Sequence, residues 1–117
     1  MVIWLIGLSG SGKSFYADKI YKELQKKNKK IIIIDGDEIR KYITYDLKYN
    51  LKDREKNSKV IQKICNFLEK KGFIVICAIL SIIKKHQKEN HKLYKKYVQV
   101  YIKANKNTIF KNNNKKI

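Results

Sequence analysis

A glycine- and serine-rich segment near the N-terminus has the composition and spacing of a phosphate-binding loop. It covers residues 7–14 and fits the pattern G-x-x-x-x-G-K-[ST]. Glycines let the backbone curl so that successive N–H groups point at phosphate oxygens, and a following helix N-terminus adds partial positive charge. Lys13 is expected to reach the β- and γ-phosphates of ATP, and the Ser14 hydroxyl to bind Mg²⁺. The residues expected to bind ATP are Gly7, Leu8, Ser9, Gly10, Ser11, Gly12, Lys13 and Ser14.

Two acidic residues, Asp35 and Asp37, directly follow the isoleucine run at residues 31–34. If this run is a strand of a parallel sheet, both carboxylates lie at the same sheet edge as the loop. The third apolar run, residues 73–79, carries no carboxylate at its end, where a GTPase or motor ATPase usually has one. The pair therefore favours a small-molecule kinase, with Asp37 orienting or deprotonating an acceptor hydroxyl. A helix N-cap and a turn residue are the alternative.

Only two of the 28 basic residues are arginines. Arg40 lies one helical turn after Asp37, and Arg54 lies near the start of the next expected helix, one turn before Asn57. A planar guanidinium suits bidentate binding of phosphate or sulfate. The positions of both arginines indicate an anionic acceptor, and a pair of surface ion-pair residues is the alternative.

Apolar runs and helical periodicities alternate along the chain. This order predicts an α/β fold: the three-layer P-loop NTPase fold, with a parallel sheet flanked by helices. We expect one domain over residues 1–117. The expected strands cover residues 2–6, 31–34, 73–79 and 97–102, and the expected helices 13–27, 37–44, 53–72, 83–96 and 106–110.

Together, these segments resemble the adenylylsulfate kinase family, which shows GLSGSGKS, DGDxxR, DLGF and DREENIRR in this order and spacing. The chain matches them at residues 7–14, 35–40, 46–49 and 53–57. The resemblance implies transfer of the ATP γ-phosphate to the 3′-hydroxyl of adenylyl sulfate, with ATP and Mg²⁺ as cofactors. The catalytic residues that it implies are Lys13, Asp37 and Ser81, the last being a serine described in the family as a phosphoserine. The substrate-binding residues are Asp35, Arg40, Tyr49, Arg54 and Asn57.

The chain departs from the family pattern on the acceptor side. Lys48 and Tyr49 stand where the family has Gly and Phe, and Gln87 stands where it tends to have Arg. After Ser81 the family usually has a Pro, an aromatic and a basic residue, and this chain has Ile82, Ile83 and Lys84. The acceptor is therefore left open, and a related conjugate such as cytidine diphosphoramidate, used in capsule assembly, is the alternative.

The family continues beyond its fourth strand with an R-D-x-K-x-L-Y-type lid, a final strand and a helix. Residues 112–117 resemble at most a degenerate start of that lid. We expect a kinase domain that is incomplete at the C-terminus, with the lid and last strand missing. Such a chain would turn over poorly, and a nucleotide-binding fragment without activity is a further alternative.

The composition restricts the remaining classes. The chain has 117 residues, 44% of them hydrophobic, with no apolar run long enough to span a membrane and no basic leader of a signal peptide. A cytoplasmic protein is expected. The net charge of +18 is compatible with a nucleic-acid-binding ATPase. However, lysines spread over every expected helix are more typical of biased composition, so we do not expect a nucleic-acid partner. An anionic nucleotide is the expected partner, and a homodimer is left open.

The cysteines and histidines carry no recognisable metal or redox spacing. Cys65 and Cys77 lie in apolar patterns and are expected to be core thiols, and Trp4 is expected to pack in the core. His86 and His91 lie in a lysine-rich stretch and are expected at the surface.

Overall fold

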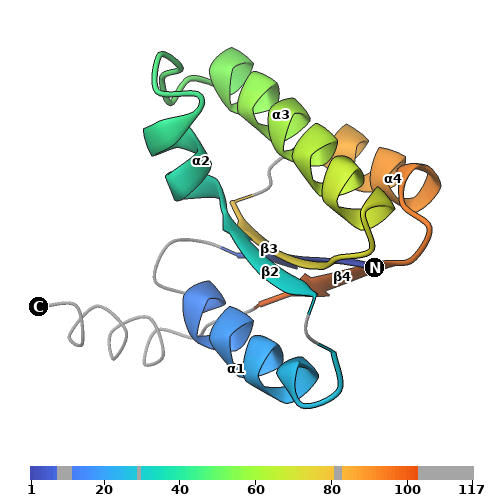
Figure 1. The fold of residues 1–117 in the computed structure, drawn as a ribbon. Coiled ribbons are helices and arrows are strands. Elements are labelled where there is room, and N and C mark those ends of the chain that lie inside the picture. The colour runs from blue at the N-terminus through green and yellow to red at the C-terminus, as the bar shows by residue number, and fades with distance from the viewer. Residues whose placement is uncertain (8–11, 29, 81–82, 103–117) are drawn as a thin grey trace, which may run out of the picture.

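The computed structural model of the protein describes residues 1–7, 12–28, 30–80 and 83–102 (Figure 1). The predicted strands and helices within these ranges are confirmed, with ends that shift by a few residues. The helix expected over 106–110 lies outside them. The elements are β1 (Val2–Ile6), α1 (Lys13–Gln25), β2 (Ile31–Asp35), α2 (Gly36–Tyr42), α3 (Leu51–Lys70), β3 (Ile74–Ile79), α4 (Lys84–Leu93) and β4 (Tyr97–Tyr101).

The four described strands form one parallel sheet in the order β2-β3-β1-β4. Ile6 of β1 pairs with Ile79 of β3, and Asp35 of β2 pairs with Ala78 of β3. The carboxyl ends of these three strands therefore meet at one edge. Because β3 lies between β1 and β2, the ends of β1 and β2 lie two strand spacings apart, about 10 Å. This edge is where ligands bind in open α/β sheets.

Helices cover both faces of the sheet, α1 on one face and α2, α3 and α4 on the other (Figure 1). The side chains of β1 divide between the two layers, because successive residues of a strand point to opposite faces. Val2, Trp4 and Ile6 belong to the core beneath α3, and Ile3 and Leu5 belong to the core beneath α1. The predicted apolar stripes of both helices are confirmed: Ala17, Ile20, Tyr21 and Leu24 of α1, and Val60, Ile61, Ile64, Cys65 and Leu68 of α3.

Local hydrogen bonds fix both ends of α3. The N-cap is Asn50, whose side chain accepts the N–H of Asp53 at 2.9 Å, so the predicted cap at Asp53 is wrong. Asp53 instead lies in the first turn, and its carboxylate accepts the N–H of Lys48 at 2.8 Å. At the other end, Gly72 has a φ of +89°, and the N–H of Phe73 bonds to the carbonyl of Leu68. This pattern is a glycine-terminated helix end, as predicted.

The expected core residues are confirmed. Cys65, Cys77 and Trp4 are all fully buried, and burial raises the pKa of the Cys77 thiol. A thiol in this environment stays protonated at neutral pH and behaves as a small apolar side chain. Within the described ranges, no helix combines the length and the apolar character that crossing a bilayer requires.

Candidate active site

The two ends of the segment expected to bind phosphate lie between β1 and α1, as the sequence predicts. Gly7 follows β1, and Gly12, with a φ of +97°, precedes α1. Among the described residues, no side chain caps the start of α1 with a hydrogen bond, and the first turn of α1 holds no acidic residue. The N–H groups of that turn therefore have no capping carboxylate from the helix itself, and a helix N-terminus in this state can bind an anion. The predicted ligands Leu8, Ser9, Gly10 and Ser11 lie outside the described residues.

Lys13 and Ser14 open α1. The Lys13 ammonium donates a hydrogen bond to the carbonyl of Gly7, which joins the two ends of the loop across its mouth. Ser14 is exposed in the first turn, one residue further along. A phosphate bound in the loop would meet an ammonium group and a hydroxyl that are both presented at the N-terminal end of α1.

Asp35 has a structural function at the start of α2. Its carboxylate accepts the N–H of Asp37 at 2.8 Å and so caps the helix, which is the alternative that the sequence left open for this residue. Asp37 lies in the first turn and is exposed. Within the described part of the chain, no donor bonds to the Asp37 carboxylate. The cap fixes the start of α2 and, with it, the position of Asp37 in the first turn.

The chain's two arginines meet at one aromatic ring. The Arg40 guanidinium carbon lies 4.3 Å from the centre of the Tyr49 ring, and that of Arg54 lies 5.6 Å from it. Arg54 Nε also donates to the carbonyl of Tyr49 at 2.6 Å, and an Arg40 Nη donates to that of Lys48 at 3.4 Å. Cation–π contacts of this kind contribute about 0.5–1 kcal/mol at exposed sites. Tyr49 therefore gathers both guanidinium groups between α2 and α3.

A cavity of about 490 Å³ opens beside this cluster. Asp37, Arg40 and Lys41 share one face of α2 because they are three and four residues apart. This volume is within the range of small-molecule sites. The candidate base and one of the two arginines therefore reach the same space. The lining residues are Asp37, Arg40, Lys41, Tyr45, Leu47 and Tyr49.

Asn57, an expected acceptor ligand, is nearly fully buried and is not among the residues that line this cavity. Its amide oxygen accepts a hydrogen bond from the hydroxyl of Thr44, which is also buried. Thr44 follows the C-terminal end of α2, so this hydrogen bond ties that end to α3. Asn57 therefore supports the cavity wall formed by α2 and does not line the cavity itself.

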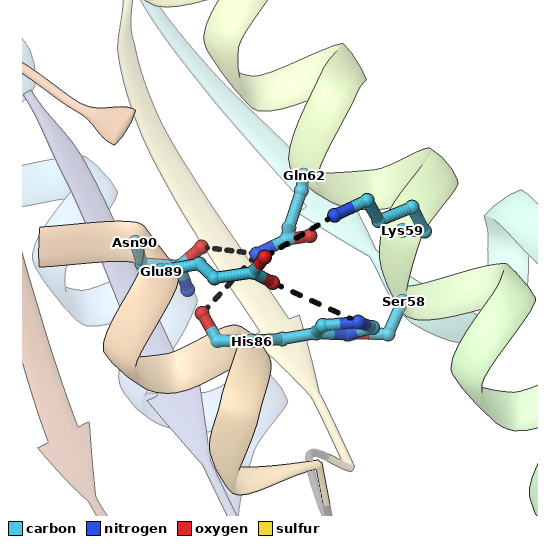
Figure 2. A network of polar contacts seen from close by, with 6 residues as sticks. All are labelled: Ser58, Lys59, Gln62, His86, Glu89 and Asn90. Carbon is cyan, nitrogen blue, oxygen red and sulfur yellow. Dashed lines mark hydrogen bonds and ion pairs between the residues drawn. The ribbon is translucent and has the colours of Figure 1, made fainter. Parts of the chain in front are cut away.

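His86 is 2% exposed, so its predicted surface position is wrong, whereas His91 is exposed as predicted. Figure 2 shows the reason: polar side chains of α3 and α4 face one another. His86 Nδ1 lies 2.8 Å from the Ser58 hydroxyl, and Gln62 Nε2 donates to the amide oxygen of Asn90 at 2.9 Å. The lysine-rich sequence of α4 predicts an exposed helix, so it gives little indication that one face of α4 packs against α3. The signal that remains is polar residues four apart on both helices.

The burial of His86 predicts an acid-sensitive fold. Burial lowers its pKa from the ordinary value of 6.5, and Glu89 opposes this shift only in part. The unfolded chain then binds the proton more readily, so stability is full above pH 6.5 and falls as the pH drops below it. We expect the unfolding free energy, measured in urea from pH 8 to pH 5, to depend less on pH in His86→Gln than in the wild type. His91→Gln is the control, and an unchanged dependence in His86→Gln would contradict this account.

The chain is similar to known proteins in family, in sequence and in structure. The family model described as adenylylsulphate kinase matches residues 1–117. The chain belongs to the adenylylsulphate kinase family. The probable adenylyl-sulfate kinase of Bacillus subtilis is 34% identical over 105 residues, covering 88% of this chain and 53% of that protein. The cytidine diphosphoramidate kinase of Campylobacter jejuni is 31% identical over 114 residues, covering 97% of this chain and 66% of that protein.

Members of the adenylylsulphate kinase family also share its fold. The APS kinase of Mycobacterium tuberculosis, solved in complex with AMPPNP and APS, superposes with a TM-score of 0.84 at 24% identity. The match covers 94% of this chain and 66% of that one. It confirms the predicted P-loop kinase fold. The chain spans 53–66% of the lengths of these two curated relatives.

The remaining expectations fall on other parts of the chain. Ser81 and the residues after 102, including the expected start of a lid, lie outside the described residues. The described residues contain no group of three His, Cys, Asp or Glu side chains placed to hold a metal ion. Mg²⁺ in kinase sites binds chiefly to phosphate oxygens and water, with few protein ligands. Ser14 and the carboxylates at the sheet edge therefore fit the ion expected with ATP.

Proposed function

We propose that the chain is a P-loop kinase domain that transfers the γ-phosphate of ATP to the 3′-hydroxyl of adenylyl sulfate. The observation that carries the proposal is the cavity that both Asp37 and Arg40 line. These two residues lie on α2, which follows β2, and the end of β2 lies at the same sheet edge as the end of β1, where the expected phosphate loop begins. Such an acceptor requires a carboxylate that takes the proton of its hydroxyl and a guanidinium that binds its anionic group. Membership of the family supports the same reaction.

On the donor side, the loop and the first turn of α1 bind the phosphates. Lys13 leaves the Gly7 carbonyl and pairs with the β- and γ-phosphates, and Ser14 binds the accompanying Mg²⁺. That ion neutralises charge on the phosphate oxygens when bound. The chain's own contribution is a set of N–H groups and an ammonium group that hold the γ-phosphate in line with the acceptor hydroxyl.

On the acceptor side, Asp37 takes the proton of the acceptor's 3′-hydroxyl while the oxygen of that hydroxyl forms a bond to the γ-phosphorus. The bond from that phosphorus to the bridging oxygen breaks at the same time, and ADP leaves with the electron pair. Arg40 and Arg54 bind the anionic linkage of the acceptor, and Tyr49 lies beside the nucleobase of the acceptor. Asp35 and Asn57 contribute by holding the two ends of α2. No covalent intermediate on Ser81 is required.

Cytidine diphosphoramidate is the second candidate acceptor. A relative of that name matches 97% of this chain at 31% identity, which is close to the value for the adenylyl-sulfate kinase of Bacillus subtilis. The departures from the family pattern at Lys48 and Tyr49 lie beside the cavity, on the acceptor side. An enzyme with either acceptor would use the same base and the same arginines.

The decisive experiment is a transfer assay with ATP and Mg²⁺ and each acceptor in turn. We expect a 3′-phosphorylated product with one of the two acceptors, together with saturable binding of that acceptor by calorimetry. The same assay is carried out on a chimaera in which the C-terminal part of the Bacillus subtilis relative is fused to this chain, so that the protein has the full length of the family. Absence of binding and transfer with both acceptors, in the chain and in the chimaera, would rule the proposal out.

The arginine cluster predicts a selective loss of acceptor affinity. Arg40→Ala or Arg54→Ala removes a charge-assisted contact worth about 1.5–3 kcal/mol, so the acceptor should bind about 10- to 100-fold more weakly. The affinity for ATP, measured by calorimetry, should stay within twofold. Lys63→Ala, which removes an exposed charge from α3, serves as the control. An equal loss of ATP affinity in both variants would assign the arginines to the donor side instead.

A further inference from the structure

Lys41 belongs to the acceptor cavity although no family motif in the sequence includes it. It follows Arg40 on α2 and lies four residues after Asp37, so all three share one helix face. The cavity lining confirms this placement, because these three residues form its α2 wall. The wall thus carries one carboxylate and two cations, which gives it a net positive charge.

The two cations of this wall, Arg40 and Lys41, differ in their contacts and in their exposure. The Arg40 guanidinium is packed on the Tyr49 ring and donates to the Lys48 carbonyl, and its Nε is buried without a hydrogen-bond partner among the described residues. The Lys41 side chain is exposed, and its ammonium lies 5.2 Å from the centre of the Tyr42 ring. Within the described ranges, no carboxylate lies within ion-pair distance of Lys41. Its charge is therefore available to a ligand in the cavity.

We propose that Lys41 is a specificity-determining residue that pairs with the anionic linkage of the acceptor. The inference rests on the proposed function and adds a cation to it. Lysine is a compact point charge on a flexible stem, so it can add a contact to an anionic group that Arg40, packed on the Tyr49 ring, binds from one fixed side. The consequence is that the cavity selects conjugates whose linkage is negatively charged over the corresponding uncharged nucleoside.

A simpler function for Lys41 makes a different prediction. A cation in the last turn of a helix stabilises it through the helix dipole, and α2 carries both Arg40 and Lys41 there. In that case a neutral residue at 41 would lower the melting temperature slightly and would change the affinities for charged and uncharged ligands equally. The pairing proposed here changes only the affinity for the charged ligand.

The test compares binding of adenylyl sulfate and of cytidine 5′-diphosphate with binding of adenosine and cytidine. The wild type is expected to bind one of the two charged ligands. The affinity for that ligand should be about fivefold to tenfold lower in Lys41→Gln. The affinity for the matching nucleoside should be unchanged, and Lys41→Arg should retain most of the wild-type affinity. The dependence of the charged ligand's affinity on salt should also become weaker. Lys63→Gln has the same net charge as Lys41→Gln and should bind like the wild type.

Each outcome separates the two proposals. If neither the wild-type chain nor the chimaera binds either charged ligand, the proposed function fails and the inference fails with it. If the wild type binds one of them and Lys41→Gln binds it as tightly as Lys63→Gln does, only the inference is overturned. An equal loss of nucleoside affinity in Lys41→Gln would likewise overturn it, because the residue would then act through the structure of α2.

Discussion

Replacing Asp37 by asparagine should lower the rate of phosphoryl transfer by about 10²–10⁴-fold, the usual contribution of a positioned acid–base group. The carboxylate lies at the cavity and is exposed, with no donor among the described residues bonded to it. Asparagine has nearly the same shape but cannot accept the proton of the acceptor hydroxyl. The rate is best measured as single-turnover transfer from γ-labelled ATP, in the chain or in the chimaera described above.

Binding separates this chemical effect from a structural one. The affinities for ATP and for the acceptor should stay within a few-fold of wild type, because Lys13 and the arginines are untouched. Asp18→Asn, which alters an exposed carboxylate on α1, is the matched control and should keep the full rate. Near-wild-type transfer by Asp37→Asn would move the base to another residue.

Replacing Lys13 by alanine should weaken ATP binding by about 10²-fold or more. The ammonium is expected to contact two phosphates, and a charge-assisted hydrogen bond contributes about 1.5–3 kcal/mol. Calorimetry or a fluorescent ATP analogue gives the affinity directly. The fold should persist, because Lys13 is outside both core clusters and its described hydrogen bond is to the Gly7 carbonyl.

The control for this variant is Lys19→Ala, which removes an exposed lysine from the same helix. It should bind ATP with wild-type affinity, and both variants should show the wild-type circular dichroism spectrum. If Lys13→Ala kept its affinity for ATP, residues 7–14 would be a strand-to-helix turn with no phosphate-binding function.

Features that depend on a few consecutive residues were predictable from the sequence. Four strands and the helices between them follow from apolar runs and helical periodicity, and Gly72 ends α3 because the left-handed backbone there favours glycine. The loop is recognisable because its glycines, its lysine and the helix after it are contiguous. The N-cap of α3 shows the limit of such reasoning. Asn50 and Asp53 are both good caps, and only the backbone geometry selects Asn50.

Positions that depend on residues distant in sequence needed the tertiary structure. The sheet order β2-β3-β1-β4 sets which strand ends are neighbours, and no local pattern contains that order. His86 is buried where α4 packs against α3, and its partner there, Ser58, lies on that other helix. The contact of Arg40 and Arg54 with a single ring, and the presence of Lys41 in the same cavity, depend on how α2 packs against α3.

The sequence by itself therefore determined the family, the phosphate loop and the residue types of the acceptor site, because these are properties of short contiguous segments. Only the tertiary structure decided which of those residues face the cavity. Asn57 and Arg54 lie one turn apart on α3, yet Asn57 is buried against Thr44 while Arg54 contacts Tyr49. The reason is physical: a helix fixes the angle between two of its side chains, but the elements packed around it determine what each side chain meets.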